Sequence, residues 1–265
     1  MAPASSERDI ARQVAIIAAF VFMIIGDAVG LGAFGGTPIR DAQDGAFSPD
    51  ASYLTPATQA FGIWTPIYVG LAAYAVWQAL PSQRTSERQR AMGWPIALTM
   101  VLNGLWLVTV QFLSVWATVV VIIALLVALV YAYLRSIQTH RPDSPRVEAV
   151  LIDGVTGLHL GWVTVATVSN ITVALTGTVP QSWLSAANWL GVIVLALVGV
   201  IGIGVSASGG WRIAPVVAIG WGLVWLAVAR LSGEPRSVSI GAMAIAMAVV
   251  VVLWPIVLRE RAPRP

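Results

Sequence analysis

The sequence predicts an all-α polytopic membrane protein, a bundle of about eight transmembrane helices. Hydrophobic residues make up 58% of the 265 residues and charged residues only 10%, against about 25% charged in ordinary globular domains. Eight apolar stretches of roughly 19 residues or more are long enough to cross a hydrocarbon core of about 30 Å. They lie near residues 12–34, 61–80, 92–113, 115–134, 148–175, 184–205, 211–230 and 237–257.

The distribution of arginine predicts the orientation. All fifteen basic residues are arginine, and an N-terminus in the cytoplasm leaves only Arg40, Arg230 and Arg236 in outer loops, so that the other twelve, up to Arg264, are inside. Cytoplasmic loops carry an excess of basic residues, so this asymmetry favours an even number of spans with both termini cytoplasmic, in the inner (plasma) membrane of a bacterium. Because topology explains the basic residues, we expect lipid and no nucleic acid as a partner.

The first span also has features of a signal peptide. Arg8 and Arg12 precede an apolar run from Val14 to Ile25. The run continues to Gly36 without a convincing cleavage site, so we expect it to remain as the first helix.

Missing residue types exclude several classes of protein. Without cysteine the chain forms no disulfide and no thiolate metal site. Without lysine it holds neither a retinal Schiff base nor the nucleotide of a P-loop. With two histidines and no clustered acids, we expect no metal site.

One connection is much longer than the others. Residues 36–60 form an outer segment of roughly 25 residues that carries Asp41, Asp44 and Asp50 against the single Arg40. Connections beyond about 12–15 residues are uncommon and often serve as lids or binding loops. A lid and a freely exposed loop remain equally open interpretations.

Three predicted spans each carry one stripe of aromatic and polar residues at helical spacing. Lipid does not satisfy polar groups, so we expect the stripes to converge on a shared interior. They are Phe61, Trp64, Tyr68 and Leu71 on the second span, Thr99, Asn103, Trp106 and Val110 on the third, and His159, Trp162, Ala166 and Asn170 on the fifth.

Two interpretations of that interior remain open. In one, the asparagines form hydrogen bonds between helices and the tryptophans fill the core. In the other, the same residues line a pocket for a flat, largely apolar ligand, because aromatic walls stack on planar π systems.

Three ionisable residues fall within spans. Asp27 in the first span is the deeper carboxylate and either pairs with His159 or stays protonated, whereas Asp153 is close enough to the inner boundary to reach water. Intramembrane ionisable groups are functional candidates by default. His159 is a candidate axial ligand for haem iron or a hydrogen-bonded interior residue.

Short motifs resemble those of the TspO/MBR family, which includes the tryptophan-rich sensory proteins and the translocator protein. LNGLW, ending at Trp106, resembles the L-N-x-x-W segment of the family's third helix, and in WVTVATVSN Trp162 precedes Asn170 by eight positions, as in its fifth helix. FGIWTPIYVG is similar to the start of the second helix, with Pro66 and with Tyr68 where tryptophan is more usual. The resemblance covers residues from about 12 to 175.

The resemblance implies a five-helix core, which we place at residues 1–178. The last three spans have no counterpart in the five-helix proteins, and we expect them to form an extension at 179–265. It also implies a pocket under the first loop for porphyrins such as haem and protoporphyrin IX or other hydrophobic ligands, with no required cofactor. Family members are typically homodimers, so we expect a possible homodimer here. Photodegradation of porphyrin has been proposed for some members, so an enzymatic activity remains an open interpretation. The ligand-binding candidates carried over are Trp64, Tyr68, Asn103, Trp106, Trp162 and Asn170, and the fifth-span stripe adds His159.

Two other functions are kept as alternatives. A secondary transporter of another small molecule would need alternating access, usually with internal repeats or broken helices. A membrane enzyme acting on lipid would need paired carboxylates, for which Asp27 and Asp153 are the available candidates.

Overall fold

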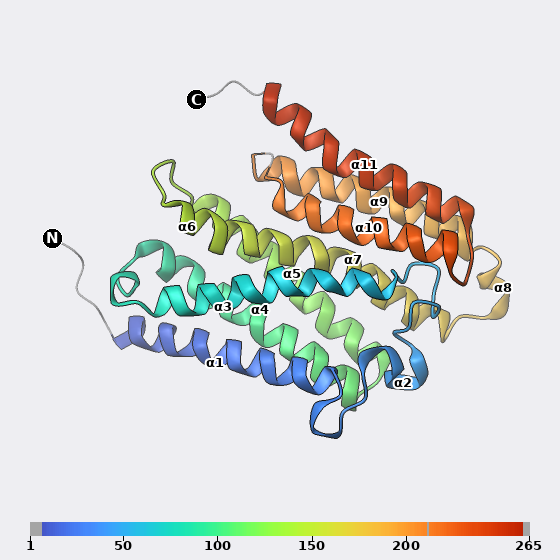
Figure 1. The fold of residues 1–265 in the computed structure, drawn as a ribbon, viewed down its shortest axis with the longest axis horizontal. Helices are drawn as coiled ribbons and strands as arrows, with labels where there is room; N and C mark the ends of the chain where they lie inside the picture. Colours follow the sequence, from blue (N-terminus) through green and yellow to red (C-terminus); the bar gives the residue numbers. More distant parts are fainter. Residues whose placement is uncertain (1–6, 211, 262–265) are drawn as a thin grey trace.

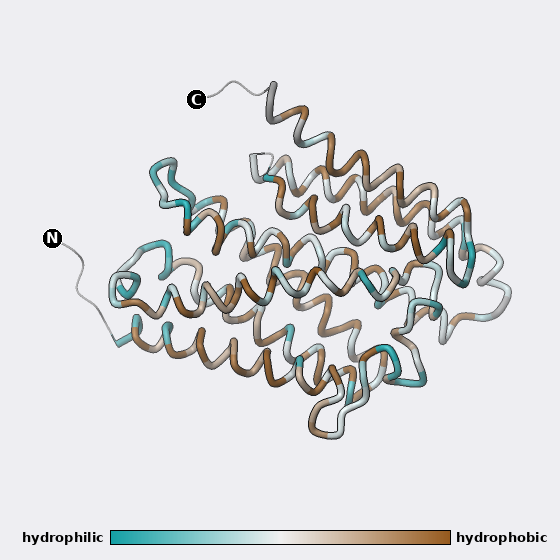
Figure 2. The backbone as a smooth tube through the Cα atoms, viewed as in Figure 1, coloured by the Kyte–Doolittle hydropathy of each residue, from teal (hydrophilic) through white to brown (hydrophobic). Residues whose placement is uncertain are grey.

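The computed structural model describes residues 7–210 and 212–261, so position 211 at the start of the predicted seventh span and Arg264 lie outside the described residues. Every regular element within those ranges is helical, and eight of the helices are long and apolar enough to cross a membrane. The predicted fold class is therefore confirmed. Hydrophilic residues gather at the loops at both ends of the bundle, and apolar residues follow the helices between them (Figure 2).

The long helices run back and forth along one axis (Figure 1). A 3-10 segment, η3 (Thr58–Ile63), leads into α3, and a π-helical segment, η5 (Ala149–Gly154), leads into α7. Short elements lie in the connections: η1 (Ala33–Gly35), η2 (Ile39–Asp41), α2 (Ala42–Gly45), η4 (Pro81–Gln83), α6 (Arg146–Glu148) and α8 (Gln181–Leu184). The long helices are α1 (Glu7–Gly30), α3 (Trp64–Ala79), α4 (Glu87–Phe112), α5 (Val115–Gln138), α7 (Val155–Thr176), α9 (Ala187–Ser208), α10 (Ala214–Ser232) and α11 (Val238–Arg261).

Local sequence explains several helix ends. Ser86 and Ser114 begin α4 and α5 as N-caps, each accepting a hydrogen bond from a backbone N–H three residues later. The turn between these helices is as tight as the sequence predicts. The first span is shorter at its far end than predicted, because α1 stops at Gly30 and Gly32 takes a left-handed conformation with φ of 96°.

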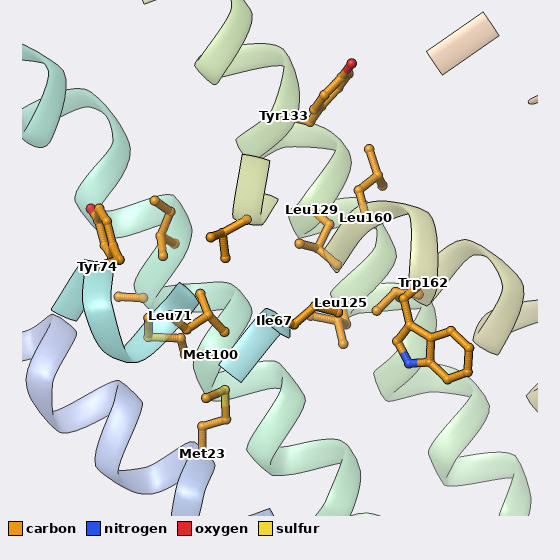
Figure 3. Packing of buried hydrophobic residues seen from close by; sticks show 14 of the residues in the cluster. Met23, Ile67, Leu71, Tyr74, Met100, Leu125, Leu129, Tyr133, Leu160 and Trp162 are labelled. Carbon is orange, nitrogen blue, oxygen red and sulfur yellow. The ribbon is translucent and has the colours of Figure 1, made fainter. Parts of the chain in front are cut away.

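Two large hydrophobic clusters lie among the long helices, and a small third one, Ala42, Phe47 and Val110, joins the long loop to α4. The first large cluster lies among α1, α3, α4, α5 and α7, and Figure 3 shows Met23, Ile67 and Leu125 within it. The second lies among α9, α10 and α11 and includes Val165 of α7 and Leu54 of the long loop. This arrangement is compatible with a five-helix core and a three-helix extension, and that division stays a prediction.

Helices α7 and α10 join the two large clusters by an unusually close approach. A Cβ atom placed on Gly161 would lie 2.1 Å from the carbonyl oxygen of Pro215, and one on Gly157 would lie 2.9 Å from the Cβ of Ala214. Small residues allow such backbone contact between transmembrane helices. The extension is therefore packed directly against the helix that carries His159, Trp162 and Asn170.

We expect Gly161→Ala to destabilise the protein by about 2 kcal/mol, because overpacking typically costs about 1–3 kcal/mol and the obstructing atom is backbone. Thermal unfolding in detergent, followed by tryptophan fluorescence, measures the change. Gly204→Ala is the matched control, since a Cβ there meets nothing within 4 Å. Equal midpoints for the two variants would show that the close approach is unimportant.

Candidate ligand-binding site

The three predicted stripes meet between α3, α4 and α7. The ring of Trp64 lies 5.7 Å from that of His159 and 6.1 Å from that of Trp162, in edge-to-face geometry, and Phe61 lies 5.8 Å from Trp162. These are favourable aromatic arrangements. The shared interior predicted from the spacing is formed, and its walls are largely aromatic.

Part of this interior is a complete hydrogen-bond network between helices. The indole Nε1 of Trp106 donates to Oδ1 of Asn170 at 2.8 Å, and Nδ2 of Asn170 donates to the hydroxyl of Thr118 at 2.8 Å. The Thr118 hydroxyl in turn donates to the carbonyl of Val115. For Asn170 and Trp106, the interpretation as interhelical bonding therefore holds, whether or not they also contact a ligand.

Three other polar groups in the interior are buried without partners. Nδ2 of Asn103, Nε1 of Trp162 and Nε2 of His159 make no hydrogen bond to any described residue, and each of the three residues is at most 2% exposed. An unpaired buried polar group costs about 1–3 kcal/mol. Such groups in a native structure call for a specific explanation, and a role in ligand binding is one.

Two neighbouring cavities reach this interior. One, of about 50 Å³, is lined by Trp64, Asn103, Trp106, Trp162 and Asn170 among others. The other, of about 360 Å³, lies between α1, α3 and the long loop and is lined by Asp27, Trp64 and Tyr68 among others. The two cavities have four lining residues in common, namely Ile39, Phe47, Phe61 and Trp64.

Tyr68 connects the larger cavity to the interior. Its hydroxyl faces the Asp27 carboxylate and the Asn103 side chain. Asp27 lies in the last turn of α1, nearer the helix end than predicted, because that helix stops at Gly30. Asp27 forms no ion pair within the described part of the chain, so the considered pairing with His159 is not formed.

The long loop is folded over these cavities, and we call residues 36–57 the lid. Its first half is bound to the turn between α4 and α5. The amide of Gln111 exchanges two hydrogen bonds with the backbone of Thr37, at 2.9 and 2.6 Å. The side chain of Gln43 donates to the carbonyls of Val110 and Leu113 at 2.9 and 2.8 Å.

The middle of the lid is a polar turn. Gln43, Asp44 and Gly45 take consecutive left-handed conformations, with φ of 51°, 58° and 77°. The hydroxyl of Ser48 donates to the Asp50 carboxylate, and this hydrogen bond holds the pKa of Asp50 below its usual value. Asp50 is therefore ionised at neutral pH and keeps the middle of the lid in water.

The second half of the lid is bound to the last three helices through Arg230. The sequence placed this arginine in an outer loop, but it lies in the last turn of α10 and is fully buried. Its guanidinium donates to the carbonyls of Pro49 at 2.6 Å and Ser52 at 2.9 Å, and to those of Glu234 and Pro235 in the following loop. The lid is thus a bound segment and not a freely exposed loop.

At the opposite end of the bundle, Asp153 is the centre of an ion cluster. Its carboxylate lies 2.5 Å from a guanidinium nitrogen of Arg88, 3.0 Å from Arg212 and 3.2 Å from the ring of His140. Arg88 also pairs with Glu148 at 3.0 Å. Asp153 is only 8% exposed, because arginines from two other segments close over it, but it still lines a cavity of about 470 Å³ at this end of the bundle.

The two intramembrane carboxylates do not form a catalytic pair. Asp27 lies in the last turn of α1, near the lid, whereas Asp153 lies in the segment that precedes α7. These two segments are at opposite ends of the bundle (Figure 1). Asp27 and Asp153 therefore cannot act together as the paired carboxylates that a lipid-modifying enzyme would need.

The structure adds functional candidates that sequence reasoning missed. Phe47 of the lid packs on Trp106 with ring centroids 5.9 Å apart and lines both cavities. Thr118 completes the network of Asn170. Phe47 lies in a segment without periodicity, so the sequence held no signal for it. Thr118 is the one polar residue in its turn of α5, and this isolated polarity could have indicated its role.

The fold and the site together define a multi-pass helical membrane protein with a lid over an aromatic interior. The sequence model of the TSPO-like protein family matches residues 13–256, and the chain belongs to this family. The match continues beyond residue 175, where the recognised motifs end, and includes α9 and α10. Comparisons with curated proteins and with solved structures gave no match.

Proposed function

We propose that the interior beneath the lid binds a planar, largely hydrophobic ligand of the tetrapyrrole class, a porphyrin or haem, in a sensory, regulatory or transport role. The observation that carries the proposal is the buried indole donor Nε1 of Trp162, which makes no hydrogen bond to any described residue and lies beside Asn103 in the wall of an aromatic-lined cavity. Aromatic walls stack on a planar ring system, and a few polar groups fix its orientation. A small apolar core would have no need of this donor.

Cavity size indicates that binding involves the lid. Ligand pockets usually measure about 300–1,000 Å³, whereas the cavity beside Asn103 and Trp162 measures about 50 Å³. The neighbouring cavity of about 360 Å³ is separated from it by Phe47, Phe61 and Trp64. Displacing Phe47 with the lid would join the two spaces, so occupancy of the site would be linked to the position of the lid.

The histidine considered as an iron ligand lies outside this space. His159 packs edge-on against Trp64 and lines neither of the two cavities. The proposal therefore rests on binding of the macrocycle itself, with no resident cofactor required. Photodegradation of the bound porphyrin stays a hypothesis.

Transport of the ligand would need a second opening. The end of the bundle opposite the lid is held by the ion cluster of Arg88, Asp153 and Arg212. Flux through proteoliposomes distinguishes a secondary transporter of another small molecule from a receptor. The inner-membrane location, the cytoplasmic termini and the homodimer stay predictions.

We expect Trp162→Ala to weaken binding of protoporphyrin IX about tenfold, because an aromatic pair contributes about 0.5–1.5 kcal/mol beyond its buried area and about 1.4 kcal/mol is a factor of ten. Quenching of tryptophan fluorescence in detergent gives the dissociation constant. Trp254→Ala is the matched control, because Trp254 is 52% exposed on α11. Unchanged binding in both Trp106→Ala and Trp162→Ala would rule out this pocket.

A further inference from the structure

Asp27 is the carboxylate that the proposed tetrapyrrole site leaves unexplained. It lines the cavity of about 360 Å³ between α1, α3 and the lid. No arginine or histidine forms an ion pair with it in the ranges that the structure describes. Carboxylates within transmembrane helices usually pair with a cation or mark a ligand pathway, because burial of an unpaired charge is costly.

The surroundings of Asp27 attract positive charge. It lies in the last turn of α1, three residues before Gly30, where the helix dipole is negative. The dipole disfavours a carboxylate at this end and favours a cation. The hydroxyl of Tyr68 faces the carboxylate and can accept a hydrogen bond from a bound ammonium group.

The remaining walls of the cavity are aromatic. Trp64 and Tyr68 have ring centroids 5.1 Å apart, and Phe47 and Phe61 line the same space. Aromatic faces attract cations by about 0.5–2 kcal/mol and stack on flat rings. A carboxylate with aromatic walls is the arrangement that recognises a flat aromatic cation.

Arg40 is the other charged residue on this cavity, and it lies at the mouth. Its side chain is 69% exposed and forms an ion pair with Asp41 at 3.3 Å. Water and Asp41 therefore screen its charge from the interior. At the inner end of the cavity, Asp27 is therefore the one ionisable carboxylate among the lining residues, and no basic side chain lines that end.

We propose that the cavity beside Asp27 is a subsite for a cationic nitrogen, so that the ligands of this protein include flat aromatic cations such as protonated amines on fused rings. The subsite rests on the proposed function in one respect, namely that the space under the lid admits a ligand. Asp27 supplies the counter-charge, and the rings of Trp64 and Phe61, which also line the inner cavity, hold the aromatic body.

The experiment compares two probes of similar shape and different charge. The purified protein in detergent is titrated with 9-aminoacridine, which is cationic at neutral pH, and with acridine, which is uncharged, by quenching of tryptophan fluorescence. We expect Asp27→Asn to weaken binding of 9-aminoacridine about tenfold and to change binding of acridine less than twofold. Asp44→Asn, an exposed carboxylate of the lid outside both cavities, should change neither.

Binding of acridine reports whether each variant is folded. A loss of affinity for both probes in Asp27→Asn would assign Asp27 a structural role and overturn the subsite, and so would equal binding of 9-aminoacridine by the original and variant proteins. If the original protein binds protoporphyrin IX but Asp27→Asn leaves the affinity for 9-aminoacridine unchanged, only the subsite is wrong. If it binds none of the three compounds, the proposed function fails as well.

Discussion

Arg230→Ala should release the second half of the lid. The guanidinium donates to four carbonyls and is fully buried, so the substitution leaves Pro49 and Ser52 without their partners. A hydrogen bond to a charged group contributes about 1.5–3 kcal/mol, and we expect the free energy of lid opening to fall by about 3 kcal/mol. At about 1.4 kcal/mol for each factor of ten, this corresponds to roughly 100-fold faster hydrogen exchange in the lid.

Mass-spectrometric hydrogen exchange of peptides covering residues 49–57 measures this effect. The amide of Ala57 is a useful reporter, because it donates to the carbonyl of Trp225 on α10. Arg236→Ala is the control, since Arg236 is exposed in the loop that follows α10. Exchange that is equally slow in both variants would contradict the role of Arg230 in holding the lid.

Asp153→Asn should destabilise the whole bundle by about 3–5 kcal/mol. The substitution keeps the shape of the side chain but removes the negative charge that Arg88 and Arg212 share. Removing one member of a buried ion pair leaves an uncompensated charge, and this accounts for the magnitude. The effect should reach both helix groups, because Arg212 belongs to the loop that precedes α10 whereas Arg88 belongs to α4.

Thermal unfolding in detergent measures the loss, and Asp143→Asn is the control. Asp143 is exposed in the loop that precedes α6 and forms no ion pair with any residue that the structure describes. A change of less than about 1 kcal/mol in Asp153→Asn would mean that the cluster is screened like a surface ion pair. The same variant would then be expected to keep its ligand affinity.

The sequence was informative where periodicity applies. Apolar length located the eight spans, and a spacing of three and four residues correctly placed Trp64, Asn103 and Trp162 on faces that meet. It was uninformative for contacts between distant segments. The burial of Arg230 depends on carbonyls of the lid, about 180 residues away along the chain, and no local pattern records such a pairing.

Cavity size could not be predicted either. Whether a stripe of tryptophan and asparagine lines an open pocket or fills it depends on side-chain positions set by the lid, as Phe47 on Trp106 shows. The ends of helices were similarly decided by single residues. The left-handed Gly32 shortens α1 and brings Asp27 to the lid, whereas hydropathy alone extends the span by several residues.

The two anchors of the lid limit how far the helix groups can separate. Gln43 is bound to the α4–α5 turn and Pro49 to Arg230 of α10, six residues apart in sequence. Six residues of extended chain reach roughly 20 Å at most. The lid is therefore a tether of fixed length. A larger displacement must detach one anchor, and the two uncharged hydrogen bonds of Gln43 should yield before the buried guanidinium does.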